Sequence, residues 1–215
     1  MPPPFPTGDE ADTRAAIMAA TYVAISKHGY SELSMQKIAD EFEKSKSLLY
    51  HHYDGKDDLL LDFLRFMQER FDEYTDVSGD GNARDGLYRF LSLFFPHFED
   101  RDRAFDGIDA GMARMYIELR AQAAHSTDYL REFERSDDLV RERLVEIVER
   151  GIERGEFRDV DPEAVADFLR HLVSGALLHR VTATDDHALV LVRRELEWYV
   201  DGRIIREQTD STTDE

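Results

Sequence analysis

Proline is nearly absent from the body of this sequence. Four of its six prolines lie within the first six residues, and the other two are Pro96 and Pro162. Proline removes a backbone donor and breaks the interior of a helix, so a chain with so few can form long helices over most of its length. Apolar residues recur at helical spacing, and the alternation typical of strands is scarce. We therefore predict an all-α protein.

Length and composition narrow the class further. The 215 residues suffice for one large domain or two unequal ones. The absence of cysteine excludes a disulfide framework and any cysteine-containing zinc site. The N-terminus lacks the basic start and apolar core of a signal peptide, and no apolar run reaches the ~18 residues of a membrane span. We expect a soluble, cytoplasmic protein without a membrane segment.

Start and stop signals define the predicted helices. A first helix begins at Thr13 and stops at Gly29, and Ser34 and Ser45 stand where the N-caps of two short helices are expected. A long helix then runs from Lys56 to about residue 76, and a linker rich in Gly and Asp follows. Further helices are expected at about residues 83–98, 104–125, 128–154, 162–182 and 185–203.

The two short helices, with a longer helix on each side, have the spacing of a helix-turn-helix. If Leu49 and Tyr53 point inward, the outward residues of the second short helix are donor-rich side chains suited to phosphates and base edges: Lys46, Ser47, Tyr50 and His51. The helix macrodipole disfavours a cation in a first turn, so a phosphate contact explains Lys56 better than local stability does. A three-helix packing without DNA would show the same spacing.

The charge is distributed unevenly. A net charge of -19 opposes contact with DNA phosphates. All five lysines, however, lie between Lys27 and Lys56, and residues 1–56 carry a net charge of only -2 against -17 for residues 57–215. The acid excess also indicates a cytoplasm of high salt concentration, in which the Debye length falls to about 3 Å and repulsion is screened.

Several motifs stand together between residues 29 and 59. They are Gly29-Tyr30, Ser34 with Ile38-Ala39, and the stretch from Ser45 to Leu59 that holds Leu49-Tyr50, Tyr53 and Lys56. In combination they resemble the DNA-binding region of TetR-family regulators over about residues 12–65. The resemblance implies that Ser34 and Lys56 contact phosphates. It implies base or phosphate contacts from six further residues: Gln36, Lys46, Ser47, Tyr50, His51 and His52.

The resemblance also implies a division of the chain. The parts are a disordered arm (1–12), a helix-turn-helix DNA-binding domain (13–55), a helical ligand-binding and dimerisation domain (56–206) and a flexible tail (207–215). Two positions depart from the family pattern. Phe42-Glu43 occupies a turn where small residues are usual, and a left-handed backbone at Glu43 would be strained. Leu48 replaces a small polar residue; it contacts a thymine methyl group or, as we favour, covers the domain.

The last two predicted helices have wide apolar faces, which suggests a four-helix dimer interface with two helices from each subunit. Burial of both faces within one subunit is the alternative. The residues predicted for the interface are Phe168, Leu172, Gly175, Ala176, Leu189, Val192, Leu196 and Tyr199.

The middle helices are rich in aromatic residues and methionine. Such residues form either ordinary core or, in a domain of this family, the wall of an apolar cavity for a hydrophobic effector. The candidates are Phe63, Phe66, Met67, Tyr88, Phe94, Phe95, Met112, Met115 and Tyr116.

No motif for metal, phosphate or nucleophilic chemistry occurs. The sequence lacks HExxH, GxSxG and the GxxxxGK loop, and its histidines are scattered. We expect a transcriptional regulator without a cofactor, a homodimeric repressor released from a palindromic DNA operator by a hydrophobic effector. The alternatives are an architectural DNA-binding protein without an effector and a helical metalloenzyme.

Overall fold

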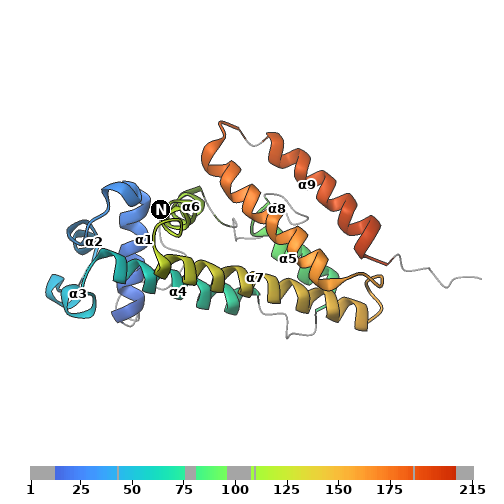
Figure 1. Cartoon of the computed structure of the whole chain (residues 1–215), viewed down its shortest axis with the longest axis horizontal. Helices are drawn as coiled ribbons and strands as arrows, with labels where there is room; N and C mark the ends of the chain where they lie inside the picture. Colours follow the sequence, from blue (N-terminus) through green and yellow to red (C-terminus); the bar gives the residue numbers. More distant parts are fainter. Residues whose placement is uncertain are drawn as a thin grey trace, which may run out of the picture. The chain divides into compact units, whose positions relative to one another are not determined.

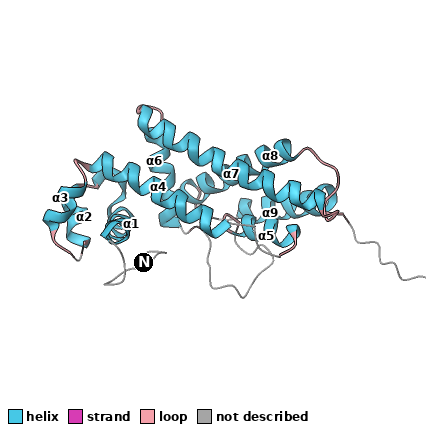
Figure 2. Cartoon of the chain, turned by 90° about the horizontal axis from the view of Figure 1, so that it is seen from below, coloured by secondary structure: helices cyan, strands magenta, loops and turns pink. Residues whose placement is uncertain are grey.

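The computed structural model describes residues 13–42, 44–75, 81–95, 108, 110–185 and 187–206. Within these ranges the regular secondary structure is helical (Figures 1 and 2), which confirms the all-α prediction. None of the helices described has the length and apolar character needed to cross a membrane. The elements are α1 (Thr13–Glu32), α2 (Met35–Glu41), α3 (Lys46–His52), α4 (Lys56–Thr75), α5 (Ala83–Ser92), α6 (Ala110–Gln122), α7 (Thr127–Glu153), α8 (Pro162–Thr182), α9 (His187–Tyr199) and the π-helical turn η1 (Val200–Ile204).

The chain forms two compact units. The first comprises residues 1–74 and 109–137, and the second comprises residues 75–108 and 138–215. The first unit therefore holds the two short helices together with α1, nearly all of α4, α6 and the start of α7. The second holds α5, the rest of α7, α8, α9 and η1. The functional boundary between residues 13–55 and 56–206 stays a prediction, because these units describe packing only.

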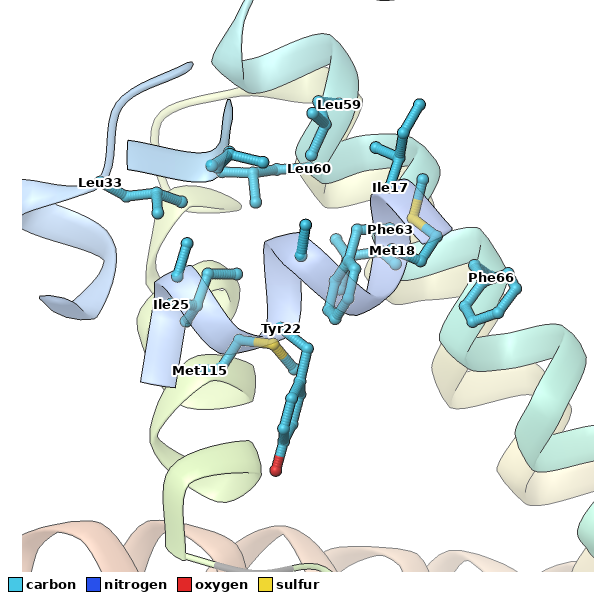
Figure 3. Close-up of a cluster of buried hydrophobic side chains, with 14 of the residues drawn as sticks. Ile17, Met18, Tyr22, Ile25, Leu33, Leu59, Leu60, Phe63, Phe66 and Met115 are labelled. Atoms are coloured by element: carbon cyan, nitrogen blue, oxygen red, sulfur yellow. The ribbon is translucent and has the colours of Figure 1, made fainter. Parts of the chain in front are cut away.

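The core of the first unit gathers side chains from distant parts of the sequence (Figure 3). Tyr22 of α1, Phe63 of α4 and Met115 of α6 belong to one apolar cluster and are almost completely buried. Burial of one such side chain contributes about 1.5–3 kcal/mol. The helix-turn-helix thus rests on helices that the sequence places on both sides of the linker.

The predicted signals end and begin the helices largely as expected. Gly29 has φ 70°, a left-handed conformation that favours glycine, and it interrupts the helical backbone near the end of α1. Ser34 caps α2 by accepting a hydrogen bond from the backbone N–H of Lys37. Ser45 occupies the N-cap position of α3, but its side chain makes no capping bond, so that part of the prediction is wrong.

Helix boundaries differ from the prediction in the middle of the chain. The described part of α5 ends at Ser92 and turns through residues 93–95, where a helix to residue 98 was expected. The predicted start of the next helix, at residue 104, lies outside the described residues.

In the second unit, the turn after α7 is held by residues 204–206. Gly155, with φ 70°, lies two residues beyond the end of α7, and buried Phe157 forms an isolated antiparallel bridge with Ile205. Asp161 caps α8 by accepting hydrogen bonds from two backbone N–H groups, and Pro162 is the first helical residue, as predicted.

Candidate nucleic-acid interface

The short helix α3 presents a polar face to solvent. Leu49 is fully buried, whereas Tyr50 is 52% exposed. Lys46, Ser47 and His51 are exposed as well. This orientation agrees with the predicted inward and outward residues. The burial of Leu49 fixes the rotation of α3, and the donors of its other face are left available for a ligand.

Two predicted DNA-contacting side chains meet at one carboxylate. Gln36 on α2 donates from Nε2 to Asp40 Oδ1 over 2.9 Å, and Lys46 on α3 donates to the same oxygen. These two bonds lower the pKa of the Asp40 carboxyl, with Lys46 as the larger cause. The contact connects the end of α2 to the start of α3.

The remaining polar residues of this surface make local contacts. Ser47 shares a hydrogen bond of 2.6 Å with Ser45, which explains why Ser45 does not cap α3. The rings of His51 and His52, both exposed, lie edge to face with centroids 5.9 Å apart. Ser34 is exposed at the start of α2. DNA contacts by these side chains stay predictions.

Lys56 has a structural partner that the sequence did not indicate. Its Nζ lies 4.2 Å from the centroid of the Tyr30 ring, and both residues are half-buried; a cation–π contact contributes about 0.5–1 kcal/mol even at an exposed site. Lys56 therefore has a stabilising role in this first turn, besides the predicted phosphate contact. Tyr30 is held in turn by Glu118 of α6, whose carboxylate accepts a hydrogen bond of 2.7 Å from the Tyr30 backbone N–H.

Asp62 of α4 anchors both ends of the helix-turn-helix region. It accepts two hydrogen bonds from Arg14 at the start of α1, of 3.1 and 2.9 Å, and one of 2.6 Å from Tyr53 Oη after α3. Burial opposes the charge, but the Arg14 and Tyr53 bonds keep the pKa of Asp62 below its usual value. The exposed face of α3 is thus oriented by α4.

The two departures from the family pattern have different outcomes. Leu48 is partly buried and packs against the core of the first unit, so it covers the domain as we favoured. Glu43 lies outside the described residues.

The α8–α9 pair carries most of the exposed apolar surface. Phe168 near the start of α8 packs on Tyr199 at the end of α9, with ring centroids 4.6 Å apart, so the helices run antiparallel and side by side (Figure 1). Among the described residues, six of the nine exposed large apolar side chains belong to this pair. They are Phe168, Leu178, Val190, Leu191, Val192 and Trp198. An exposed patch of this kind is typical of an interaction surface.

The predicted dimer residues divide by burial. Phe168, Gly175 and Val192 are exposed, and Leu172 and Tyr199 are half-buried. Ala176, Leu189 and Leu196 are buried within the second unit, which removes them from the contact surface. The predicted residues differ in burial because each helix has two apolar stripes. One stripe packs inside the subunit and the other is exposed, and the spacing of apolar residues does not show which is which.

The predicted effector residues do not form one group. Six belong to the first unit's apolar cluster or pack against it: Phe63, Phe66, Met67, Met112, Met115 and Tyr116. Tyr88, Phe94 and Phe95 are buried in the second unit, where Tyr88 Oη donates to Asp201 over 2.6 Å. Beside the first cluster, Arg120 pairs with Asp137 at 2.6 Å and bonds to Tyr116 Oη.

Several residues that shape these surfaces were missed from the sequence. Asp40 and Glu118 act through partners on other helices, and no local pattern marks them. Leu178, Leu191 and Trp198 were detectable as members of wide apolar faces, but their exposure was not. Within the described ranges, no three His, Cys, Asp or Glu side chains gather in a way that could hold a metal ion.

Comparison with known families gives two matches along the chain. The family described as "Bacterial regulatory proteins, tetR family" matches residues 17–63. The family described as "BetI-type transcriptional repressor, C-terminal" matches residues 83–204. Together they span the helix-turn-helix and most of the remaining helices.

Individual relatives agree with these matches. The chain is 26% identical over 173 residues to the HTH-type transcriptional repressor KstR2 of Rhodococcus jostii, a match that covers 79% of this chain and 80% of that protein. A TetR transcription regulator from Haloarcula marismortui is 33% identical with a TM-score of 0.73, covering 89% of this chain and 97% of that one. A chain from Saccharomonospora viridis, solved in complex with choline, has the same fold at 20% identity and a TM-score of 0.73, covering 90% and 98%.

Proposed function

Because this chain belongs to the TetR family of bacterial regulatory proteins, we propose that it is a homodimeric repressor that grips a palindromic operator through α3. The observation that carries the proposal is the exposed donor face of α3, with Leu49 buried behind it. In a dimer the two α3 helices would enter successive major grooves, about 34–36 Å apart. The contacts assigned to α3 would read bases, and those assigned to Ser34 and Lys56 would hold the backbone.

Replacing Tyr50 or Lys46 with Ala is expected to weaken operator binding by about tenfold or more, since a good base contact contributes about 1–3 kcal/mol of discrimination. The operator is first identified by genome-wide mapping of binding sites, and affinity is then measured by fluorescence anisotropy. Both side chains are exposed, so the melting temperature should not change.

Lys56→Ala is the comparison variant. It should weaken operator and unrelated DNA about equally, because a phosphate contact carries no sequence information. Unchanged affinity in both α3 variants would exclude α3 as the reading helix. Footprinting tests the alternative of an architectural DNA-binding protein. Such a protein would protect DNA with little sequence preference, whereas a regulator would protect specific sites.

The dimer is proposed to form through the exposed stripes of α8 and α9. On α8, Phe168, Leu172, Gly175 and Leu178 recur at helical spacing, and exposed Gly175 permits close approach of a second helix. Trp198 of α9 is 65% exposed with the Arg194 guanidinium 5.9 Å from its ring centroid, and tryptophan is a side chain enriched at interfaces. A four-helix interface would cover this patch.

We further propose that a hydrophobic effector lowers operator affinity by shifting the dimer between two states. The two candidate sites are the apolar cluster with Met67, Met112 and Tyr116 at its partly buried margin, and the region around Tyr88 and Phe94.

A panel of lipophilic compounds, with choline as a polar cationic comparison, should contain a class that raises the melting temperature by about 5–10 °C. That range follows from about 2.7 kcal/mol of stabilisation at a hundredfold excess over Kd. The same class should release the operator. Met112→Ala tests the first candidate site and Tyr88→Phe tests the second. The variant that loses the shift in melting temperature identifies the site that is used. A panel without any shift would contradict the effector part of the proposal and leave the DNA-binding part intact.

A further inference from the structure

Asp40 of α2 accepts one hydrogen bond from its own helix and one from the reading helix α3. Its Oδ1 accepts from Gln36 Nε2 at 2.9 Å and from Lys46 Nζ. The side chains of Asp40 and Lys46 are each 54% exposed, so the pair lies at the surface and can open. Gln36 and Lys46 are also two of the side chains assigned to DNA.

A carboxylate and a phosphate compete for the same kind of donor. Both offer anionic oxygens to an ammonium group, and charge-assisted hydrogen bonds of this type are the stronger ones. Lys46 and Gln36 cannot direct the same hydrogens at Asp40 and at DNA. Lys46 has three donor hydrogens and Gln36 has two, so the contacts with Asp40 do not block these donors entirely, but the hydrogens that Asp40 holds reach DNA only by exchange.

We propose that Asp40 is an internal competitor of DNA for Lys46 and Gln36, and that it lowers both the affinity for DNA and the dependence of that affinity on salt. The inference rests on the proposed function, because it requires α3 to meet DNA. Asp40 is then a positioning residue: in the free protein it holds the donors in place, and binding releases them.

The effect on salt dependence follows from ion counting. Each phosphate neutralised by a lysine releases condensed counterions, which makes the slope of log K against log salt steeper by about 0.9. When Lys46 leaves Asp40, the freed carboxylate takes up a cation, and this uptake offsets the release. The wild-type slope is therefore expected to be shallower by about one than that of a protein without the carboxylate.

Other lysines of this region follow a similar pattern. Lys27 donates to both carboxylate oxygens of Glu41 at 2.8 and 2.7 Å, and Lys37 donates to Glu32 at 3.2 Å. These pairs do not involve α3. The Lys27–Glu41 pair supplies the control, because Glu41 directly follows Asp40 in the sequence and its partner Lys27 lies on α1.

The test is Asp40→Asn, measured by anisotropy on operator and unrelated DNA from about 0.1 to 1 M KCl. Asn keeps the shape and an acceptor for Gln36 but loses the charge that holds Lys46. We expect affinity for both DNAs to rise about fivefold near 0.15 M salt, the upper range for breaking one exposed ion pair. We expect the slope to become steeper by about one.

Glu41→Gln makes the same change of charge one residue away and should alter affinity less than twofold. Asp40→Asn should also have no effect in a protein that carries Lys46→Ala and Gln36→Ala, because the donors are gone. An equal gain in affinity from Asp40→Asn and Glu41→Gln, or a gain that persists without the donors, would overturn the competition and indicate simple repulsion of DNA.

The failure of this inference can be distinguished from the failure of the proposed function. If Lys46→Ala and Tyr50→Ala leave affinity unchanged, the proposed function fails. If Lys46→Ala weakens binding and Asp40→Asn changes nothing, only this inference fails.

Discussion

A Gly175→Arg substitution is expected to yield folded monomers that bind the operator about 10²–10⁴-fold more weakly. In the dimer the second α3 binds at a high effective concentration once the first is engaged, and a monomer loses this gain. Gly175 lies in the exposed stripe of α8, between Phe168 and Leu178. An arginine there would place bulk and charge in an interface that depends on close helix approach.

The substitution is suited to this question because the monomer tolerates it. A Cβ atom at Gly175 would have no heavy atom within 4 Å, and arginine favours a helix over glycine by up to about 1 kcal/mol. Sedimentation velocity reports the mass, and circular dichroism reports the helix content. Gly81→Arg, at another exposed glycine whose Cβ would meet nothing within 4 Å, is the matched control and should remain dimeric.

Leu178→Glu provides a second variant on the same stripe and should also dissociate the dimer, since Leu178 is 48% exposed in the subunit. If both variants sediment as dimers with unchanged operator affinity, the α8–α9 patch is not the interface. A monomeric Gly175→Arg protein with full operator affinity would show instead that dimerisation is not needed for binding.

Transfer into about 0.01 M salt is expected to unfold most of the protein. The Debye length then reaches about 30 Å, so that acidic side chains repel one another across a whole unit. Residues 57–215 carry a net charge of -17, and their exposed ion pairs, such as Arg131–Asp128 at 3.4 Å, cannot neutralise that excess. Repulsion of this kind opposes the compact state.

The measurement is the far-ultraviolet helical signal and melting temperature across a KCl series. Both should recover as KCl is restored, whereas sucrose, which does not screen charge, should recover much less. Full helix content and an unchanged melting temperature at low salt would contradict the interpretation of the acidic composition as an adaptation to concentrated salt.

The helix-turn-helix region could be predicted because its signals are local. Ser34 as a cap, the stop at Gly29 and the inward position of Leu49 all follow from spacing within a few residues, and the structure agrees with each. The same holds for Asp161 and Pro162 at the start of α8. These elements depend on backbone geometry and on one buried face, both of which a short stretch of sequence specifies.

Other features depended on residues far apart in the chain. Glu118 reaches Tyr30 across 88 positions, and Asp62 reaches Arg14 across 48. No periodicity indicates such partners. The aromatic and methionine residues form one group in the sequence, yet Met115 and Phe94 lie in different units, because α6 belongs to the first unit and α5 to the second.

Local sequence was therefore sufficient for the existence of most helices, the caps at Ser34 and Asp161, the outward face of α3 and the family. Only the folded chain shows which side chains contact that face and how the residues divide between two cores. It also shows which apolar stripe of α8 and of α9 is buried. Ala176 and Gly175 are adjacent small residues, but Ala176 is buried and Gly175 is exposed. Which side of a helix meets its own subunit is determined by the helices packed against it, and that packing is a property of the whole chain.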